Sequence, residues 1–185
     1  MGEQVGKVVG ITFDDGYLNN LSHALPVLKR LNFSSPCYVV SQLLGQSNLW
    51  DEAVGVPQSP LMNVDELKIW IQGGQEVGAH TRKHTRLTSL ETLSSRDEIV
   101  SCKHDLESAL GGPVHHFCYP YGEYSAEHVE LVESAGYLTA TTTFRGRCVS
   151  GEDVLQLPRV PVVRRTNRAG LWLKIASPYE EHRRR

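Results

Sequence analysis

The sequence contains no apolar run approaching the roughly 18 residues that a membrane span requires, and residues 1–7 lack the charged and apolar regions of an export signal. We therefore expect a soluble chain, cytoplasmic as written and secreted or periplasmic if the sequence is trimmed. Its 19 Lys and Arg against 21 Asp and Glu provide no overall attraction to nucleic acid. The oligomeric state is not fixed by these features.

Cysteine is scarce, and its four positions include no CxxC pair, which argues against a zinc ribbon. The 40% hydrophobic and 22% charged composition excludes disordered and fibrous classes. We expect residues 1–185 to form a single domain with a core at about 8–176, because this length can bury a substantial core without disulfides.

Short apolar runs alternate with segments of helical periodicity. The predicted strands are residues 8–13, 37–40, 76–79, 116–119, 138–142 and 160–163, and the predicted helices are 20–31, 64–71, 93–110 and 126–134. Alternation of this kind predicts an α/β fold with parallel strands and outer helices, either a barrel or an open sheet. In such folds the functional sites lie at the carboxyl ends of the strands.

Asp14 and Asp15 follow the first predicted strand and precede Gly16. In an extended segment their side chains point to opposite sides, so one can bind a metal while the other faces a substrate water. Asp-Asp-Gly is also a common turn sequence, and the pair alone does not decide between these interpretations.

His80 and His84 follow the predicted strand 76–79 and would lie on one side of a helical turn. Two histidines and one carboxylate form a common catalytic site for zinc or another first-row divalent ion. Spacing alone is weak evidence, since eight histidines give such a pair by chance fairly often.

A third segment, residues 117–122, reads Phe-Cys-Tyr-Pro-Tyr-Gly and is by itself compatible with a strand and a turn. Together the segments TFDDG, HTRKH and YPYG, with a Gly-rich lead-in to the histidines, resemble the NodB-homology polysaccharide deacetylases, the family 4 carbohydrate esterases. The resemblance spans about residues 8–163. It implies a distorted, seven-stranded (β/α) barrel.

The same resemblance implies a role for each matched residue. Asp14 would be the catalytic base, and Asp15, His80 and His84 would bind a divalent metal, zinc first, with Co, Ni or Mn as alternatives. The backbone N–H of Tyr121 would help to stabilise the oxyanion. These roles agree with the needs of amide hydrolysis, which are a Lewis acid, an activated water and a base.

Two positions depart from the family pattern. The arginine that often opens the third motif and orients the base is here Cys118, and Arg159, within Leu-Pro-Arg, is expected to replace it and to pair with Asp14. No late Leu-x-His supplies the general acid. His115, His116 and His182 are weak candidates for that role.

Some aromatic and apolar residues allow two interpretations. Trp172 and Leu173, in the apolar stretch 171–175, are expected to pack in the core as a closing strand, and the alternative is that they line an acetyl pocket. Trp50 and Tyr17 could stack on a sugar face.

The sequence therefore predicts a metal-dependent enzyme that removes acetyl groups from N-acetylated amino sugars of a glycan. The missing acid leaves open a catalytically impaired, carbohydrate-binding relative or an O-acetyl esterase on the same fold. A Mg-dependent phosphoryl-transfer enzyme is less favoured, because no phosphate-binding loop is present and the histidine pair suits a softer metal.

Overall fold

The computed structural model describes residues 8–183, and its strands form one parallel sheet of five strands in chain order. The strands are β1 (Pro36–Val39), β2 (Glu76–Ala79), β3 (His116–Cys118), β4 (Thr139–Arg145) and β5 (Leu157–Arg159). Because each strand runs parallel to the next, all five carboxyl ends meet at one edge of the sheet. The predicted parallel α/β organisation is confirmed.

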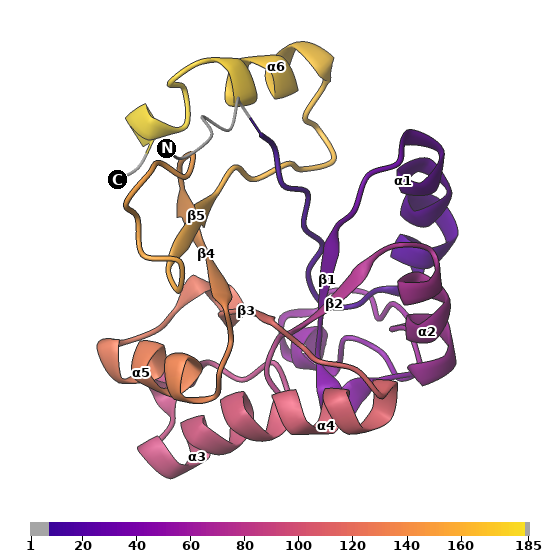
Figure 1. Cartoon of the computed structure of the whole chain (residues 1–185), viewed down its shortest axis with the longest axis vertical. Helices are drawn as coiled ribbons and strands as arrows, with labels where there is room; N and C mark the ends of the chain where they lie inside the picture. The colour runs from indigo at the N-terminus through magenta and orange to yellow at the C-terminus, as the bar shows by residue number, and fades with distance from the viewer. Residues whose placement is uncertain (1–7, 184–185) are drawn as a thin grey trace, which may run out of the picture.

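The helices are α1 (Leu25–Leu31), α2 (Val64–Gln72), α3 (Thr92–Arg96), α4 (Cys102–Leu110), α5 (Ala126–Ser134) and α6 (Arg168–Ala176). Figure 1 shows the strands curving in an arc, with α1 to α5 along its outer side and α6 near the end of β5. Within residues 8–183, no helix has both the length and the apolar composition needed to cross a membrane.

The predicted helices 20–31 and 93–110 each contain a π-helical turn. Asn20–Ala24 precedes α1, and Asp97–Ser101 connects α3 to α4. Gly111 ends α4 in the left-handed conformation, with φ 74°, as the Gly stop predicts.

The predicted strand 8–13 is wrong apart from its last residue. Phe13 forms an isolated parallel bridge with Cys37, and its N–H and C=O bond to Pro36 O at 3.1 Å and Tyr38 N at 2.8 Å. Val8 is 75% exposed, so the burial that would favour a longer strand is absent there. This single bridge still places the residues after Phe13 beside the end of β1.

Two predictions near the C-terminus are also wrong. The last strand is β5 rather than residues 160–163, where Val162 and Val163 are 63% and 50% exposed and lack the burial that favours a strand. Residues 171–175, expected as a strand, lie in helix α6. The side chain of Asn167 caps this helix by accepting a hydrogen bond from Gly170 N at 2.8 Å, which favours the helix over a strand. Trp172 is 69% exposed, so its expected core packing is wrong as well.

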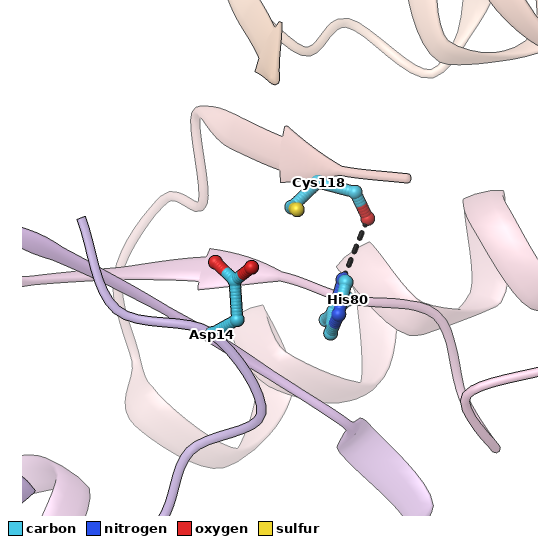
Figure 2. Close-up of side chains that lie close together, drawn as sticks. All are labelled: Asp14, His80 and Cys118. Carbon is cyan, nitrogen blue, oxygen red and sulfur yellow. Dashed lines mark hydrogen bonds between the residues drawn. The ribbon is translucent and has the colours of Figure 1, made fainter. Parts of the chain in front are cut away.

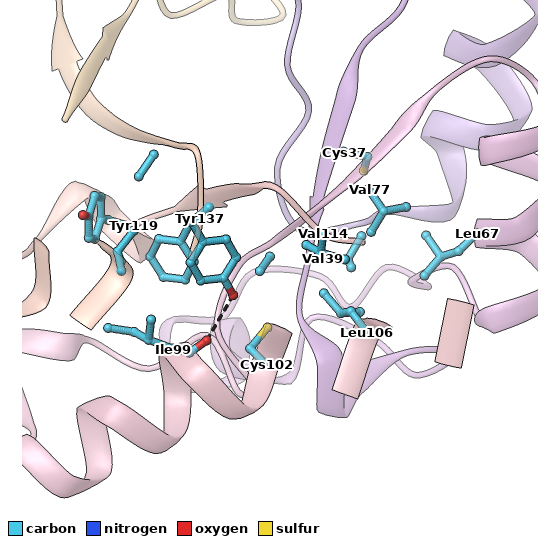
Figure 3. Close-up of a cluster of buried hydrophobic side chains, with 14 of the residues drawn as sticks. Cys37, Val39, Leu67, Val77, Ile99, Cys102, Leu106, Val114, Tyr119 and Tyr137 are labelled. Atoms are coloured by element: carbon cyan, nitrogen blue, oxygen red, sulfur yellow. Dashed lines mark hydrogen bonds between the residues drawn. The ribbon is translucent and has the colours of Figure 1, made fainter. Parts of the chain in front are cut away.

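A continuous apolar core lies between the sheet and the outer helices (Figure 3). Val39 and Phe117 from the strands meet Leu106 of α4 and Ile99 of the preceding turn, all essentially buried. Tyr137 donates its hydroxyl to Ile99 O at 3.0 Å, which satisfies a polar atom inside this core. This packing fixes the positions of the strand ends.

Candidate active site and metal centre

The side chains singled out in the sequence gather at the carboxyl edge of the sheet. Asp14 and Asp15 follow the Phe13 bridge, His80 follows β2, and Arg159 ends β5. This convergence is a direct consequence of the parallel topology, since every βα junction opens on the same edge.

Asp14 and Asp15 have different partners because the backbone turns sharply at Asp15 and Gly16. Asp15 has φ 72° and Gly16 has φ 80°. A Cβ at Gly16 would lie 2.9 Å from Val39 Cγ1, so only glycine fits this turn without displacing β1. The turn directs one carboxylate toward the histidines and the other toward Arg159.

Asp15, His80 and His84 form a compact donor group. Asp15 Oδ1 lies 3.4 Å from Nε2 of His80 and 3.4 Å from Nε2 of His84. Ligands at 2.0–2.1 Å from a tetrahedral zinc ion stand about 3.3–3.4 Å apart, so these spacings fit such an ion. Burial alone would raise the pKa of Asp15, but its contacts with the two imidazoles hold the pKa well below its usual range.

The tautomer of His80 suits metal binding. Its Nδ1 lies 2.7 Å from the carbonyl oxygen of Cys118, which can only accept, so Nδ1 carries a proton and Nε2 is the ring nitrogen left to bind a metal.

His84 is held by rings rather than by a hydrogen bond at Nδ1, which is buried and has no partner within the described residues. Trp50 stacks on the imidazole at 4.4 Å between centroids, and Tyr121 meets it edge-on at 4.7 Å. Burial lowers the pKa of His84, although Asp15 opposes the shift. The neutral ring that a metal requires is therefore favoured.

The segment from His80 to His84 is not the helical turn predicted from the spacing. Thr81 and His84 have φ 65° and 59°, and His84 N donates to Thr81 Oγ1 at 3.0 Å. These left-handed residues bring the two rings within 4.8 Å of each other in an edge-on contact. The spacing therefore indicated the correct pair for the wrong local reason.

Asp14 is bound by Arg159 through two parallel hydrogen bonds, NH1 to Oδ1 at 2.6 Å and NH2 to Oδ2 at 2.8 Å. The expected pairing of these residues is confirmed. Arg159 also donates to Thr142 O at 2.8 Å, Thr12 Oγ1 at 3.2 Å and Cys118 Sγ at 3.3 Å. The guanidinium is thus held in one orientation, and it holds the Asp14 carboxylate in turn.

A second group of potential ligands consists of Asp14, His80 and Cys118, shown in Figure 2. A cation there would face the Arg159 guanidinium, which already bonds to Asp14 and Cys118. The Nδ1 proton of His80 is also committed to the Cys118 carbonyl. The arrangement with Asp15 and His84 is the better metal site, because the guanidinium that binds Asp14 and Cys118 would repel a metal ion held by the second group.

Tyr121 lies in the turn Pro120–Gly122 after β3 and has φ 58°. Thr143 Oγ1 donates to its carbonyl at 3.2 Å, and the Arg86 guanidinium lies 3.9 Å from the centre of its ring. The ring contacts with His84 and Arg86 were not foreseen from the sequence. The expected role of its N–H stays a prediction.

The candidate acids lie away from this edge. His116 is at the amino end of β3, with Nε2 2.9 Å from Glu76 Oε2, and His115 precedes it. His182 is exposed and bonds to Pro178 O at 2.7 Å. Of these three histidines, none contacts the donor group within the described residues.

Trp50 and Tyr17, considered as sugar platforms, have structural neighbours at the site. Trp50 packs on His84. Tyr17 forms an isolated antiparallel β-bridge with Leu61, and burial and the charge of Asp15 raise the pKa of its hydroxyl. No sequence signal links Trp50 to His84, because the contact depends on how the irregular excursion 45–60 folds over the strand ends.

The sequence profile of polysaccharide deacetylases matches residues 2–140. Among curated proteins, YxkH of Bacillus subtilis (strain 168), whose name gives it provisionally as a polysaccharide deacetylase, is 27% identical over 156 residues. That match covers 84% of this chain and 52% of YxkH, so the chain spans about half the length of this relative.

Two solved structures share the fold. The Streptococcus pyogenes deacetylase PplD, in complex with acetate, has a TM-score of 0.80 at 22% identity, covering 93% of this chain and 72% of PplD. BC0361, a polysaccharide deacetylase from Bacillus cereus, has a TM-score of 0.77 at 25% identity. The match covers 93% of this chain and 52% of the BC0361 chain. The predicted deacetylase-type α/β fold is confirmed, with five regular strands and no closed ring of strand pairs within residues 8–183.

Proposed function

Because the chain belongs to the polysaccharide deacetylase family, we propose that it removes acetyl groups from N-acetylated amino sugars in a poly- or oligosaccharide, using a divalent metal, zinc first. The observation that carries this proposal is the convergence of two functional units at one strand edge. Asp15, His80 and His84 form a metal-sized donor group, and the adjacent Asp14 is clamped by Arg159.

The metal would be held by Asp15 Oδ1 and by Nε2 of His80 and His84. It would supply Lewis acidity to the acetyl carbonyl and to the attacking water. The buried His80 supports this assignment, because its Nδ1 donates to the Cys118 carbonyl and its Nε2 is the ring nitrogen that faces Asp15.

Asp14 would act as the general base. It would take a proton from the water whose oxygen attacks the acetyl carbon, while Arg159 keeps the carboxylate aimed at that water. The Tyr121 N–H would donate to the oxygen that gains charge as the carbonyl becomes tetrahedral. The C–N bond would then break as the proton taken up by Asp14 passes, directly or through solvent, to the departing nitrogen, and the products are acetate and a free amine.

An O-acetyl esterase is the second candidate, and the positions of His115, His116 and His182 away from the site favour it. An amine leaves poorly unless it is protonated, a step worth typically 10²- to 10⁴-fold, whereas an alkoxide needs less help. An impaired, carbohydrate-binding relative would share the same geometry.

The test is acetate release from N-acetylglucosamine oligomers and from O-acetylated xylan, measured on metal-depleted protein and again after zinc is restored. We expect zinc-dependent release from the N-acetyl substrate, and a loss of about 10²- to 10⁴-fold in Asp14→Asn. Release from xylan alone would favour the esterase. No release from either, with zinc bound, would favour the impaired relative.

A further inference from the structure

The segment that connects the two histidines needs external support. Thr81 and His84 both have left-handed backbones, a conformation that persists only where the surroundings enforce it. Between them, the N–H groups of Arg82 and Lys83 require acceptors. The acceptor that they share determines how firmly the two imidazoles are held.

That acceptor is the carboxylate of Glu98. Its Oε2 receives hydrogen bonds from Arg82 N at 2.8 Å and from Lys83 N at 3.0 Å. Glu98 lies in the π-helical turn before α4 and is only 6% exposed. A buried carboxylate is unfavourable without partners, and these two N–H groups are the partners that the structure gives it.

The other contacts of residues 81–84 do not involve the N–H groups that Glu98 binds. The Arg82 side chain binds Asp97 at 2.6 Å and Asp105 at 3.0 Å, at the partly exposed rim. Gln42 N donates to Arg82 O at 2.9 Å, which satisfies the carbonyl side. Glu98 is the side chain that accepts from the N–H groups of Arg82 and Lys83, so it holds this part of the backbone from its buried side.

Resting on the metal site proposed above, we infer that Glu98 is a positioning residue for that site. It has no contact with the donor atoms and acts through the backbone of residues 82 and 83. Without it, the segment is free to relax from its left-handed turns, and His84 loses its alignment with His80 and Asp15. Outer partners of metal ligands typically contribute 10- to 100-fold in metal affinity.

The experiment measures the zinc dissociation constant by competition with a fluorescent chelator, at a temperature where circular dichroism shows each variant folded. Glu98→Ala is expected to raise this constant by about 10- to 100-fold. Glu98→Gln keeps an oxygen acceptor and should lie closer to wild type. Glu98→Asp keeps the charge but loses reach, so it should resemble Glu98→Ala, and it replaces that variant if Glu98→Ala does not fold.

Glu107→Ala is the matched control. Glu107 of α4 also accepts from a backbone N–H, that of Val114 at 2.9 Å, but it has no bond to the histidine segment. The zinc affinity of the Glu107→Ala variant should equal that of wild type. Equal affinity in Glu98→Asp, Glu107→Ala and wild type would overturn the role of Glu98, whereas a wild-type protein that binds no zinc would overturn the proposed metal site itself.

Discussion

At the scale of single residues, the backbone at Asp15 gives two adjacent carboxylates separate environments. Asp15 faces two imidazoles, and Asp14 faces a guanidinium. Cys118 contributes through its small size as well as its sulfur, because the Arg159 NH2 group lies against Sγ at 3.3 Å. The arginine that holds Asp14 therefore comes from β5 and lies against Cys118.

Arg159→Lys should lower kcat by roughly 10²-fold while zinc stays bound. A lysine keeps the charge but cannot form the two parallel bonds that orient Asp14, and misplacing a catalytic group by about 1 Å can cost this much. Steady-state kinetics with parallel zinc analysis provide the measurement. Arg145→Lys is the matched control, because Arg145 is partly exposed and lies 4.0 Å from the buried Glu180, away from Asp14. An unchanged kcat in Arg159→Lys would show that orientation of Asp14 is not needed.

At the scale of elements, α5 begins with a capping box whose second member is a histidine. Ser125 N donates to His128 Nδ1 at 2.9 Å, and His128 Nε2 lies 3.1 Å from Ser95 Oγ of α3. Nδ1 must be unprotonated to accept this bond. Burial lowers the pKa of His128, against the charge of Glu127.

This arrangement predicts that folding stability decreases in mild acid. The unfolded chain takes up a proton near the ordinary histidine pKa of about 6.5, while the folded state resists it until lower pH. The contribution of His128 is therefore complete above that pH and is lost as the pH falls toward its folded-state pKa.

His128→Gln preserves the box without a titrating group. Urea unfolding of both proteins from pH 8 to pH 5 should show wild type losing stability relative to the variant below about pH 6.5. Parallel curves across this range would contradict the prediction.

The elements differ in how well the sequence predicts them. Residues 76–79 and 126–134 have the predicted bounds because periodicity, flanking Gly and a Ser cap all agree. Residues 171–175 were misassigned because a short apolar run fits a strand or a helix equally, and the deciding signal, Asn167, lies outside the run. Residues 8–13 failed because their pairing depends on the edge of β1 alone.

The candidate site shows the same division. Asp14, Asp15 and His80 were predicted because they follow the predicted strands 8–13 and 76–79, His84 from its spacing to His80, and Arg159 from the resemblance to the deacetylases. The stacking of Trp50 on His84 was not predictable. It depends on tertiary packing between segments more than 30 residues apart in the chain.

At the scale of the whole molecule, one parallel sheet in chain order brings the segments carrying Asp14, Asp15, the histidines and Arg159 to a single edge. The chain shares its fold with PplD and BC0361, matches the polysaccharide deacetylase family over residues 2–140, and spans about half of the curated relative YxkH. The division of roles between the two aspartates can be tested on this chain alone.

The most direct measurement is the zinc content per chain, after dialysis, of wild type, Asp14→Asn and Asp15→Asn. We predict one zinc per chain in wild type and in Asp14→Asn, because Asp14 is bound to Arg159 rather than to the donor group. Asp15→Asn should lose the metal, since it removes the charged ligand shared by His80 and His84. Zinc retained in Asp15→Asn and lost in Asp14→Asn would contradict the account, because the two carboxylates would then have the opposite roles.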